Sequence, residues 1–212
     1  PESAVQDLLI LGAGVHEIEM AEIVERVNAV GPAWNLLGFI SPKGRRLGEK
    51  LNGYPVLGPA EALADFPRAS LLPGNDWPFS SELPRERMAT LVDPTCFVSR
   101  TAQIGRGCVF FPHGFIGLNA RVGDRAFALD GCVVNHDSVV EDRVTFASHV
   151  VLAGGVHVEP ECYLGQSCTV RQNLRIGRDS LIGMAAVVVD DVPPNSVMVG
   201  NLAESAARDI GA

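Results

Sequence analysis

Two histidines of this sequence stand beside residues that could give them a chemical role. His136 is followed directly by Asp137, and a histidine that is held rigidly in place is well suited to positioned proton transfer. His16 closes a glycine-containing turn, where it could add a positive charge or a hydrogen bond to a bound anion. The alternative for each is an ordinary structural or solvated residue, so the elements that hold them decide between the two interpretations.

The turn before His16 lies between a short strand and a helix. An apolar run at 8–11 is followed by Gly12-Ala13-Gly14-Val15-His16, and apolar residues then recur at helical spacing over 18–27. Amides at a helix N-terminus can bind a phosphate. Glu17 and Glu19, however, place negative charge in the same first turn, which suits the helix dipole but opposes an anion. The turn lacks the third glycine of GxGxxG, so a structural turn and a phosphate site both stay open.

The segment around His136 follows a period of six residues. An apolar residue recurs at every sixth position without interruption, and a small or aliphatic residue stands two positions before each. Neither a helix nor a simple strand gives this register for so long, so we predict a parallel β-helix of hexapeptide repeats in which both positions point inward. The alternative is an all-β sandwich with chance spacing. The central positions are Val98, Ile104, Phe110, Ile116, Val122, Ala128, Val134, Val140, Phe146, Leu152, Val158, Leu164, Val170, Ile176, Ile182 and Val188.

This period predicts where His136 lies. It stands two positions after the central Val134, so we expect it at a corner of the coil, pointing outward. One coil later, eighteen residues on, the same corner holds Gly154, at the inter-strand spacing of about 4.8 Å. We predict that this position without a side chain admits an acetyl thioester and that the Gly154 amide binds the developing oxyanion.

Glycines and cysteines also recur at defined positions of the repeat. We attribute the glycines that directly follow a central residue to corners that need unusual backbone angles. They are Gly105, Gly117, Gly123, Gly165, Gly177 and Gly183. The cysteines all stand at the small inward position, which predicts buried, reduced thiols and a cytoplasmic protein. They are Cys96, Cys108, Cys132, Cys162 and Cys168.

The other histidines of the repeats do not predict a metal site. His113 and His149 both stand three positions after a central residue and lie two coils apart, or about 10 Å, which is too far for one metal ion. His157 precedes the central Val158 and faces outward from a flat side. We therefore expect no metal, and a solvated or interface role for these three histidines.

The segment before the repeats alternates between strands and helices. This order predicts a small Rossmann-like α/β domain over residues 1–90, with a parallel sheet that binds ligands at the carboxyl ends of its strands. A β-helix domain over 91–191 follows without any insertion. A C-terminal cap and tail over 192–212 ends the chain, the tail forming one or two helical turns. The expected strands lie at 8–11, 36–40, 54–58 and 69–72, and the expected helices at 18–27, 59–66 and 81–91.

The composition narrows the function classes. The chain has 212 residues, a net charge of −8 and 47% hydrophobic residues, which suits a soluble globular protein and argues against a nucleic-acid surface. No apolar run approaches the ~20 residues of a membrane span, and no secretory signal is present. We therefore expect no nucleic-acid or membrane partner.

A glycine-turn α/β domain followed by uninterrupted hexapeptides resembles the family of sialic acid O-acetyltransferases and nucleotide-amino-sugar N-acetyltransferases, which are left-handed β-helix acyltransferases. The resemblance covers nearly the whole chain, and the handedness comes from it alone. The motifs that carry it are Gly12-Ala13-Gly14-Val15-His16, Gly38-Phe39-Ile40, Tyr54-Pro55-Val56-Leu57-Gly58, Gly74-Asn75, Asn135-His136-Asp137 and the segment from Val192 to Gly200.

The resemblance implies roles for individual residues. His136 would be the general base, Asp137 would strengthen its basicity, and His16 would contact the phosphates of a nucleotide sugar. Acetyl-CoA would lie in a groove between two subunits of a homotrimer. From their positions in the repeat, we take Gly154, Thr145, Gln166 and Met184 as the residues that line this groove. Candidates for the CoA phosphates in the later coils are Arg171, Arg175 and Arg178, and the alternative for them is an exposed arginine without a specific role. The remaining substrate contacts would come from Gly14, Val15, Ser41, Gly74 and Asn75.

Two departures from the family pattern concern the substrates. Ser41-Pro42-Lys43 replaces acidic residues that would contact the nucleoside, and Gly200-Asn201-Leu202-Ala203 replaces the usual Gly-x-Pro-Ala of the cap. We expect an acetyltransferase that uses acetyl-CoA to N-acetylate an amino group on a nucleotide-linked sugar. The alternatives are O-acetylation of a sialic acid type of sugar, a non-catalytic β-helix scaffold, and a metal-dependent carbonic anhydrase.

Overall fold

The computed structural model describes residues 5–75, 77–78 and 83–206. These residues form two compact units, each described here by itself. The N-terminal unit contains the chain up to residue 94 together with 106–109, and the coil unit contains residues 95–105 and the chain from residue 110 onward.

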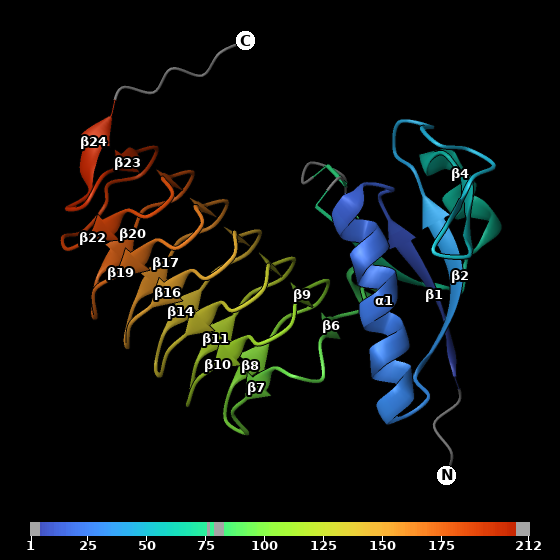
Figure 1. Cartoon of the computed structure of the whole chain (residues 1–212), viewed down its shortest axis with the longest axis horizontal. Helices are drawn as coiled ribbons and strands as arrows, with labels where there is room; N and C mark the ends of the chain where they lie inside the picture. Colours follow the sequence, from blue (N-terminus) through green and yellow to red (C-terminus); the bar gives the residue numbers. More distant parts are fainter. Residues whose placement is uncertain (1–4, 76, 79–82, 207–212) are drawn as a thin grey trace. The chain divides into compact units, whose positions relative to one another are not determined.

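The N-terminal unit is a five-stranded sheet with one α-helix (Figure 1). The strand order is β3-β4-β2-β1-β5, in which β4, β2, β1 and β5 are parallel and β3 pairs antiparallel with β4. The elements are β1 (Gln6–Leu11), α1 (Val15–Val30), β2 (Trp34–Ile40), β3 (Lys50–Leu51), β4 (Tyr54–Gly58), the 3-10 helix η1 (Ala60–Asp65), β5 (Ser70–Pro73), the 3-10 helix η2 (Arg85–Arg87) and β6 (Leu91–Val92).

The core of this unit explains why these strands form. Leu9 and Leu11 of β1, Ile40 of β2 and Leu71 of β5 are each at most 1% exposed and pack in one apolar cluster. Fully buried parallel strands read as continuous apolar runs, which is the pattern of these segments. The Gly12 N–H donates to Ile40 O at 2.8 Å and the Gly74 N–H to Leu11 O at 2.8 Å, so the carboxyl ends of the three strands meet at one edge.

Two expected helices differ from the structure. The segment predicted as a helix at 59–66 is a 3-10 helix over Ala60–Asp65, with no buried residue. The helix predicted at 81–91 falls partly outside the described residues, and its described part contains the 3-10 turn Arg85–Arg87 and the strand Leu91–Val92.

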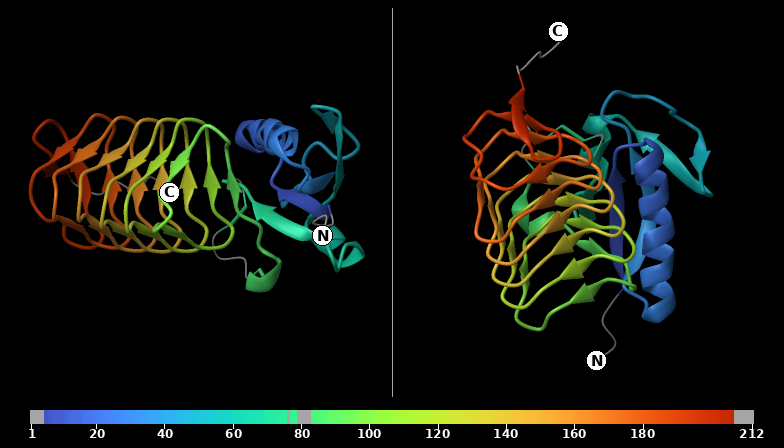
Figure 2. Two further views of the ribbon diagram at one scale, coloured as in Figure 1. Left: turned by 90° about the horizontal axis from the view of Figure 1, so that it is seen from below. Right: turned by 60° about the vertical axis from the view of Figure 1, so that its left-hand side comes forward.

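The coil unit is a parallel β-solenoid (Figures 1 and 2). Each of the sixteen predicted central positions is the second residue of a two-residue strand, which confirms the period. The strands are β7 (Phe97–Val98), β8 (Gln103–Ile104), β9 (Val109–Phe110), β10 (Phe115–Ile116), β11 (Arg121–Val122), β12 (Phe127–Ala128), β13 (Val133–Val134), β14 (Val139–Val140), β15 (Thr145–Phe146), β16 (Val151–Leu152), β17 (His157–Val158), β18 (Tyr163–Leu164), β19 (Thr169–Val170), β20 (Arg175–Ile176), β21 (Leu181–Ile182) and β22 (Val187–Val188).

Strands eighteen residues apart pair in parallel, and three flat sheets result. The β13 sheet contains β7, β10, β13, β16, β19 and β22, and the β14 sheet contains β8, β11, β14, β17 and β20. The β15 sheet contains β9, β12, β15, β18, β21 and two later strands, β23 (Val197–Val199) and β24 (Glu204–Ala206). Val134, for example, pairs with Ile116 and Leu152. Its side chain is 1% exposed, and the central residues stack as an apolar column.

The glycines that follow central residues have another cause than the one predicted. None of these six has a positive φ. A Cβ on Gly117 would lie 2.7 Å from the backbone N of His136, and one on Gly165 would lie 2.6 Å from the backbone O of Ile182. These glycines are therefore required where successive coils approach closely, not where the chain turns.

The left-handed backbone conformation occurs two positions later, three residues after the central one. Asn119, Asp137 and Asn173 have φ between 56° and 60°, and Gly155 has a φ of 70°. Asn, Asp and Gly tolerate this conformation better than other residues, which accounts for their frequency at these corners.

The described part of the C-terminal tail differs from the expected helical turns, and residues 207–212 of the expected tail lie outside the described residues. Glu204–Ala206 form strand β24, which pairs antiparallel with β23, and β23 itself pairs in parallel with β21. The strand ends the described part of the chain and covers the sheet edge that β23 would otherwise expose.

Candidate active site

His136 lies at the corner between the β13 and β14 sheets. Its side chain is 61% exposed, so it points outward as the period predicts. Its Nδ1 lies 2.9 Å from Oδ2 of Asp137. A carboxylate accepts only, so Nδ1 carries the proton of this bond when the ring is neutral, and Nε2 keeps a lone pair that can accept a proton.

The carboxylate of Asp137 is held from two sides. Asn119, one coil earlier in the same corner column, donates from Nδ2 to Oδ1 of Asp137 at 3.0 Å. The hydrogen bonds from His136 and then from Asn119 lower the pKa of Asp137 below its usual value. The left-handed φ of 57° at Asp137 brings this side chain beside the ring that precedes it. The carboxylate therefore stays ionised and fixes the orientation of the imidazole.

Gly154 lies directly beside the imidazole. A Cβ on Gly154 would lie 2.5 Å from both Cε1 and Nε2 of His136, so no other residue fits without moving the ring. Within the described residues, no acceptor is bonded to the Gly154 N–H. Pro112 and Pro160, which lack an N–H, occupy equivalent positions of other corners, and this suits a backbone group that has no partner inside the coil.

The residues that the resemblance assigned to acetyl-CoA divide into two places. Gln166 and Met184 lie at the corner between the β15 and β13 sheets, where the Ala185 N–H donates to Gln166 O at 2.8 Å and Met184 is 77% exposed. In one chain, the β13 sheet separates this corner from the corner of His136 and Gly154. Thr145 stands on the outward side of β15 and is 9% exposed.

The glycine turn of the N-terminal unit is filled by its own helix. Glu17 is 1% exposed, and its Oε2 accepts the Gly14 N–H at 2.9 Å. A Cβ on Gly12 would lie 2.7 Å from Cδ of Glu17, and one on Gly74 would also collide with this carboxylate. The Gly14 amide predicted to bind a phosphate is therefore occupied, because Glu17 caps the helix in a capping box.

The other residues predicted to bind substrate lie at or near the same sheet edge. Val15 is 71% exposed, and Asn75 is also exposed. His16 is bonded to its neighbour, with Nδ1 3.2 Å from Oε2 of Glu19. Ser41 is 2% exposed, and its Oγ accepts the Arg45 N–H at 2.9 Å, so its hydroxyl stabilises a turn. Of this set, Val15, His16 and Asn75 are accessible to a ligand.

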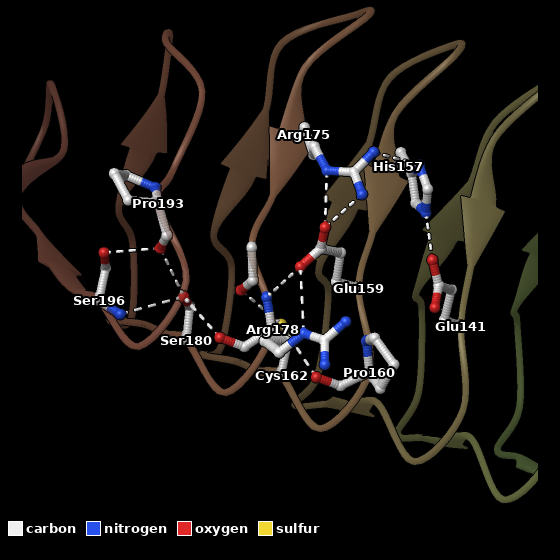
Figure 3. A network of polar contacts seen from close by, with 11 residues as sticks. Glu141, His157, Glu159, Pro160, Cys162, Arg175, Arg178, Ser180, Pro193 and Ser196 are labelled. Carbon is white, nitrogen blue, oxygen red and sulfur yellow. Dashed lines mark hydrogen bonds and ion pairs between the residues drawn. The ribbon is translucent and has the colours of Figure 1, made fainter.

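A polar network on the β14 sheet contains two of the arginines proposed for the CoA phosphates (Figure 3). Arg175 donates from Nε to Oε1 of Glu159 at 2.7 Å, and the backbone N–H of Arg178 donates to Oε2 of the same residue at 2.7 Å. His157 bridges between Oε1 of Glu141 at 2.5 Å and Nη1 of Arg175 at 3.2 Å. These charges are paired within the chain. The third candidate, Arg171, is exposed, and its guanidinium has no ion-pair partner among the described residues.

The remaining histidines and cysteines have structural surroundings. His149 is 61% exposed, with Nε2 3.4 Å from Oδ2 of Asp130. Burial raises the pKa of the Cys132 and Cys168 thiols to about 12 and that of Cys162 to about 11, and Cys96 is the least buried of the five. Among the described residues, no three His, Cys, Asp or Glu side chains are grouped as a metal site would require.

Sequence reasoning missed Asn119. Counting back one coil of eighteen residues from Asp137 leads to it, because residues one coil apart share a corner column. The repeat therefore predicts that Asn119 and Asp137 are neighbours. It does not predict that their side chains form a hydrogen bond.

Comparisons with solved structures support the fold. A histidine-to-alanine variant of GDP-perosamine N-acetyltransferase from Caulobacter crescentus, crystallised with CoA and GDP-perosamine, matches at 23% identity and a TM-score of 0.79, over 96% of this chain and 98% of that one. WeeI from Acinetobacter baumannii AYE matches at 23% identity and 0.78, over 95% and 100%. The acetyltransferase domain of PglB from Neisseria gonorrhoeae FA1090 matches at 22% and 0.67, over 95% and 100%.

Comparison with curated proteins finds shorter matches. The acyl-[acyl-carrier-protein]–UDP-N-acetylglucosamine O-acyltransferase of Synechocystis is 33% identical over 85 residues, which are 40% of this chain and 31% of that protein. The protein of the same name from Agrobacterium fabrum is 38% identical over 110 residues, 48% of this chain and 40% of that protein. The chain thus spans well under half the length of these relatives. No family model matches the sequence.

These likenesses establish the fold of the chain as a left-handed β-helix of hexapeptide repeats. In the part of the chain that the structure describes, no helix is long and apolar enough to cross a membrane.

Proposed function

We propose that this chain is an acetyl-CoA-dependent acetyltransferase that acetylates the amino group of a nucleotide-linked amino sugar, with His136 as the general base. The observation that carries the proposal is the corner at His136, where an exposed imidazole is held by Asp137 and faces the side-chain-free Gly154. A solved structure of the same fold contains CoA and GDP-perosamine, the two substrate types that the proposal needs.

The reaction follows from the tautomer of His136. The acceptor amine attacks the thioester carbonyl carbon, a C–N bond forms, and His136 Nε2 takes the proton that the amine loses. The tetrahedral intermediate then collapses, the C–S bond breaks, and the thiolate of CoA leaves and receives the proton. Asp137 stabilises the imidazolium between these two steps, and no covalent enzyme intermediate is needed.

The Gly154 amide is proposed to stabilise the oxyanion. Its N–H has no acceptor among the described residues and lies on the coil next to the ring, so it can donate to the carbonyl oxygen as negative charge develops there. A preorganised backbone donor needs no rearrangement during the reaction.

The proposed assembly is a homotrimer with its sites between subunits. Gln166 and Met184 flank one edge of the β13 sheet, and His136 and Gly154 flank the other edge. Acetyl-CoA can therefore contact both sets at once if the second corner comes from a neighbouring subunit. Outward-facing Phe97, Phe115, Val133 and Val151 make this sheet apolar, which suits burial against another copy.

The nucleotide part of the acceptor is proposed to bind the N-terminal unit, as in a Rossmann-like domain. The accessible residues at the sheet edge are Val15, His16 and Asn75. The Gly14 amide and the Ser41 hydroxyl are bonded within the chain, so we assign them no contact. We propose a cytoplasmic location, in keeping with the burial of Cys108, Cys132, Cys162 and Cys168 in the coil unit.

The test is acetyl transfer by purified protein with acetyl-CoA and a panel of GDP- and UDP-linked 4-amino sugars, GDP-perosamine included. We expect His136→Asn to lower kcat by about 10²-fold or more. His149→Asn is the matched control, because His149 is equally exposed and also stands near a carboxylate, but at another corner. Equal turnover by wild type and His136→Asn would show that this corner is not the site, as a scaffold protein would require.

A second candidate function is acetyl or acyl transfer to a sugar hydroxyl. The curated relatives are O-acyltransferases, and the same base can take a proton from a hydroxyl. The panel separates the two when a sialic acid and UDP-N-acetylglucosamine are included, because the product then carries an ester in place of an amide.

A further inference from the structure

A hollow of about 420 Å³ lies beside the His136–Asp137 pair, on the outer face of the β14 sheet. Its lining comes from three successive coils and consists of Thr101, Gln103, Asn119, Arg121, Asp137 and Val139. Its size suits a sugar ring or a phosphate group. The lining is rich in hydrogen-bond donors, and Asp137 already accepts from His136 and Asn119.

Arg121 is the positively charged residue in the lining of this hollow. The carboxylate in the lining, Asp137, is bonded to His136 and Asn119 and not to Arg121. Within the described residues, its guanidinium forms no ion pair and no hydrogen bond, although it is exposed at a corner-flanking strand. Other arginines of the coil unit do have such partners. Arg143 donates to Glu161 at 2.8 Å, and Arg175 donates to Glu159.

The repeat explains this difference. Arg121 and Arg175 occupy the same outward column of the β14 sheet, three coils apart. The partner of Arg175, Glu159, stands sixteen residues before it, and the residue sixteen before Arg121 is Gly105. The position that carries Glu159 beside Arg175 is therefore occupied by Gly105 beside Arg121. Because Gly105 has no side chain, the guanidinium of Arg121 has no carboxylate partner there and can interact with a ligand in the hollow.

Both substrates of the proposed reaction carry phosphates that need such a cation. The glycine turn of the N-terminal unit does not offer its Gly14 amide, because the buried Glu17 carboxylate accepts that N–H. A guanidinium, by contrast, binds phosphate through paired, charge-assisted hydrogen bonds.

We propose that Arg121 binds a phosphate group of a substrate in this hollow and so positions that substrate beside His136. The proposal rests on the proposed function for the identity of the substrates, and the phosphate comes either from the acceptor diphosphate or from CoA. Gln103 and Asn119 are placed to donate further hydrogen bonds to the same group.

The test measures binding, so it does not depend on turnover. Titration calorimetry of wild type, Arg121→Gln and Arg175→Gln with GDP, UDP, CoA and dephospho-CoA gives the Kd of each probe. We expect Arg121→Gln to raise the Kd about tenfold for the nucleotides or for CoA, and the effect to shrink at high salt. Arg175→Gln, in the same column, is expected to leave every Kd unchanged.

The pattern of the effect identifies the source of the phosphate. A change for GDP or UDP assigns the acceptor diphosphate, a change for CoA and dephospho-CoA assigns the pyrophosphate of CoA, and a change for CoA alone assigns its 3′-phosphate. Wild type that binds none of the probes, or an Arg121→Gln variant that binds them like Arg175→Gln, overturns the proposal. Failure of the proposed function is separate, since it would appear as His136→Asn retaining acetyl transfer.

Discussion

At the scale of the residue, the candidate site is a short chain of hydrogen bonds built across two coils. Asn119 donates to Asp137, and Asp137 accepts from His136, so the ring is oriented from a rigid backbone. The left-handed φ of Asp137 and of Asn119 is what places both side chains in one column. Asn and Asp are among the few residues that adopt this conformation without much strain.

Replacing the carboxylate isolates its contribution. We expect Asp137→Asn to lower kcat by about 10- to 100-fold with little change in the KM for acetyl-CoA, because a neutral amide no longer stabilises the imidazolium. Steady-state kinetics with saturating acceptor measures this effect.

Asn119→Ala provides the comparison for a positioning role. Asn119 donates to the ionised carboxylate of Asp137 and only helps to hold it in place, so we expect a loss of about fivefold in kcat. A loss in kcat for Asn119→Ala as large as that for Asp137→Asn would contradict this assignment, since at saturating substrate Asn119 is expected to affect the proton transfer through Asp137.

At the scale of the element, the polar network on the β14 sheet ties successive coils together (Figure 3). The backbone N–H of Arg178 and then the side chain of Arg175 lower the pKa of Glu159 below its ordinary value of about 4.5. A carboxylate with a lowered folded-state pKa adds stability that is present above its unfolded-state pKa. That stability is lost as the pH falls through the lowered pKa.

Glu159→Gln tests this linkage. We expect the variant to be less stable than wild type at pH 7, and the difference between the two to shrink as the pH falls below about 4.5. Urea denaturation at pH 7 and pH 3 gives both free energies of unfolding. Glu61→Gln, an exposed substitution in the other unit, should show no such pH-dependent difference; an equal gap at both pH values for Glu159→Gln would contradict the assignment.

At the scale of the whole molecule, the coil unit presents two unlike outer faces. The outward column of the β13 sheet contains Phe97 and Phe115, whose rings stack at 5.0 Å, followed by Val133 and Val151. The β14 sheet carries Gln103, Arg121, Val139, His157 and Arg175 in the equivalent column. The apolar face is therefore the one that we expect to be buried between subunits.

A charge placed on the apolar face tests the assembly. We expect Val151→Lys to separate the proposed trimer into single chains, because a lysine in the centre of a buried apolar contact is costly to desolvate. Light scattering coupled to size exclusion measures the mass. Acetyl transfer should fall with it, since the proposed site needs two subunits.

Val139→Lys makes the same substitution on the β14 sheet and is the control for mass. It should leave the assembly intact. A Val151→Lys protein with the mass of wild type would place the interface elsewhere.

The sequence determined most of the coil unit by itself. A period of six predicts every strand from β7 to β22, the outward direction of His136, and Gly154 as its neighbour one coil on. These features depend only on rules that repeat along the chain, namely the alternation of side chains in a strand and eighteen residues per coil. The burial of four of the five cysteines follows from the same rules.

Only the tertiary structure decided how side chains from different segments meet. Glu17 fills the glycine turn because Gly12 and Gly74, more than sixty residues apart in the sequence, close the same space around it. Arg121 has no carboxylate partner among the described residues, because the coil before it has Gly105 at the position where the coil before Arg175 has Glu159. The glycines that follow central residues are required because the backbone of the next coil lies too close to leave room for a Cβ. Each of these features depends on a contact between side chains or backbone atoms of different segments. The pattern of residues along the sequence does not contain the distances between such atoms.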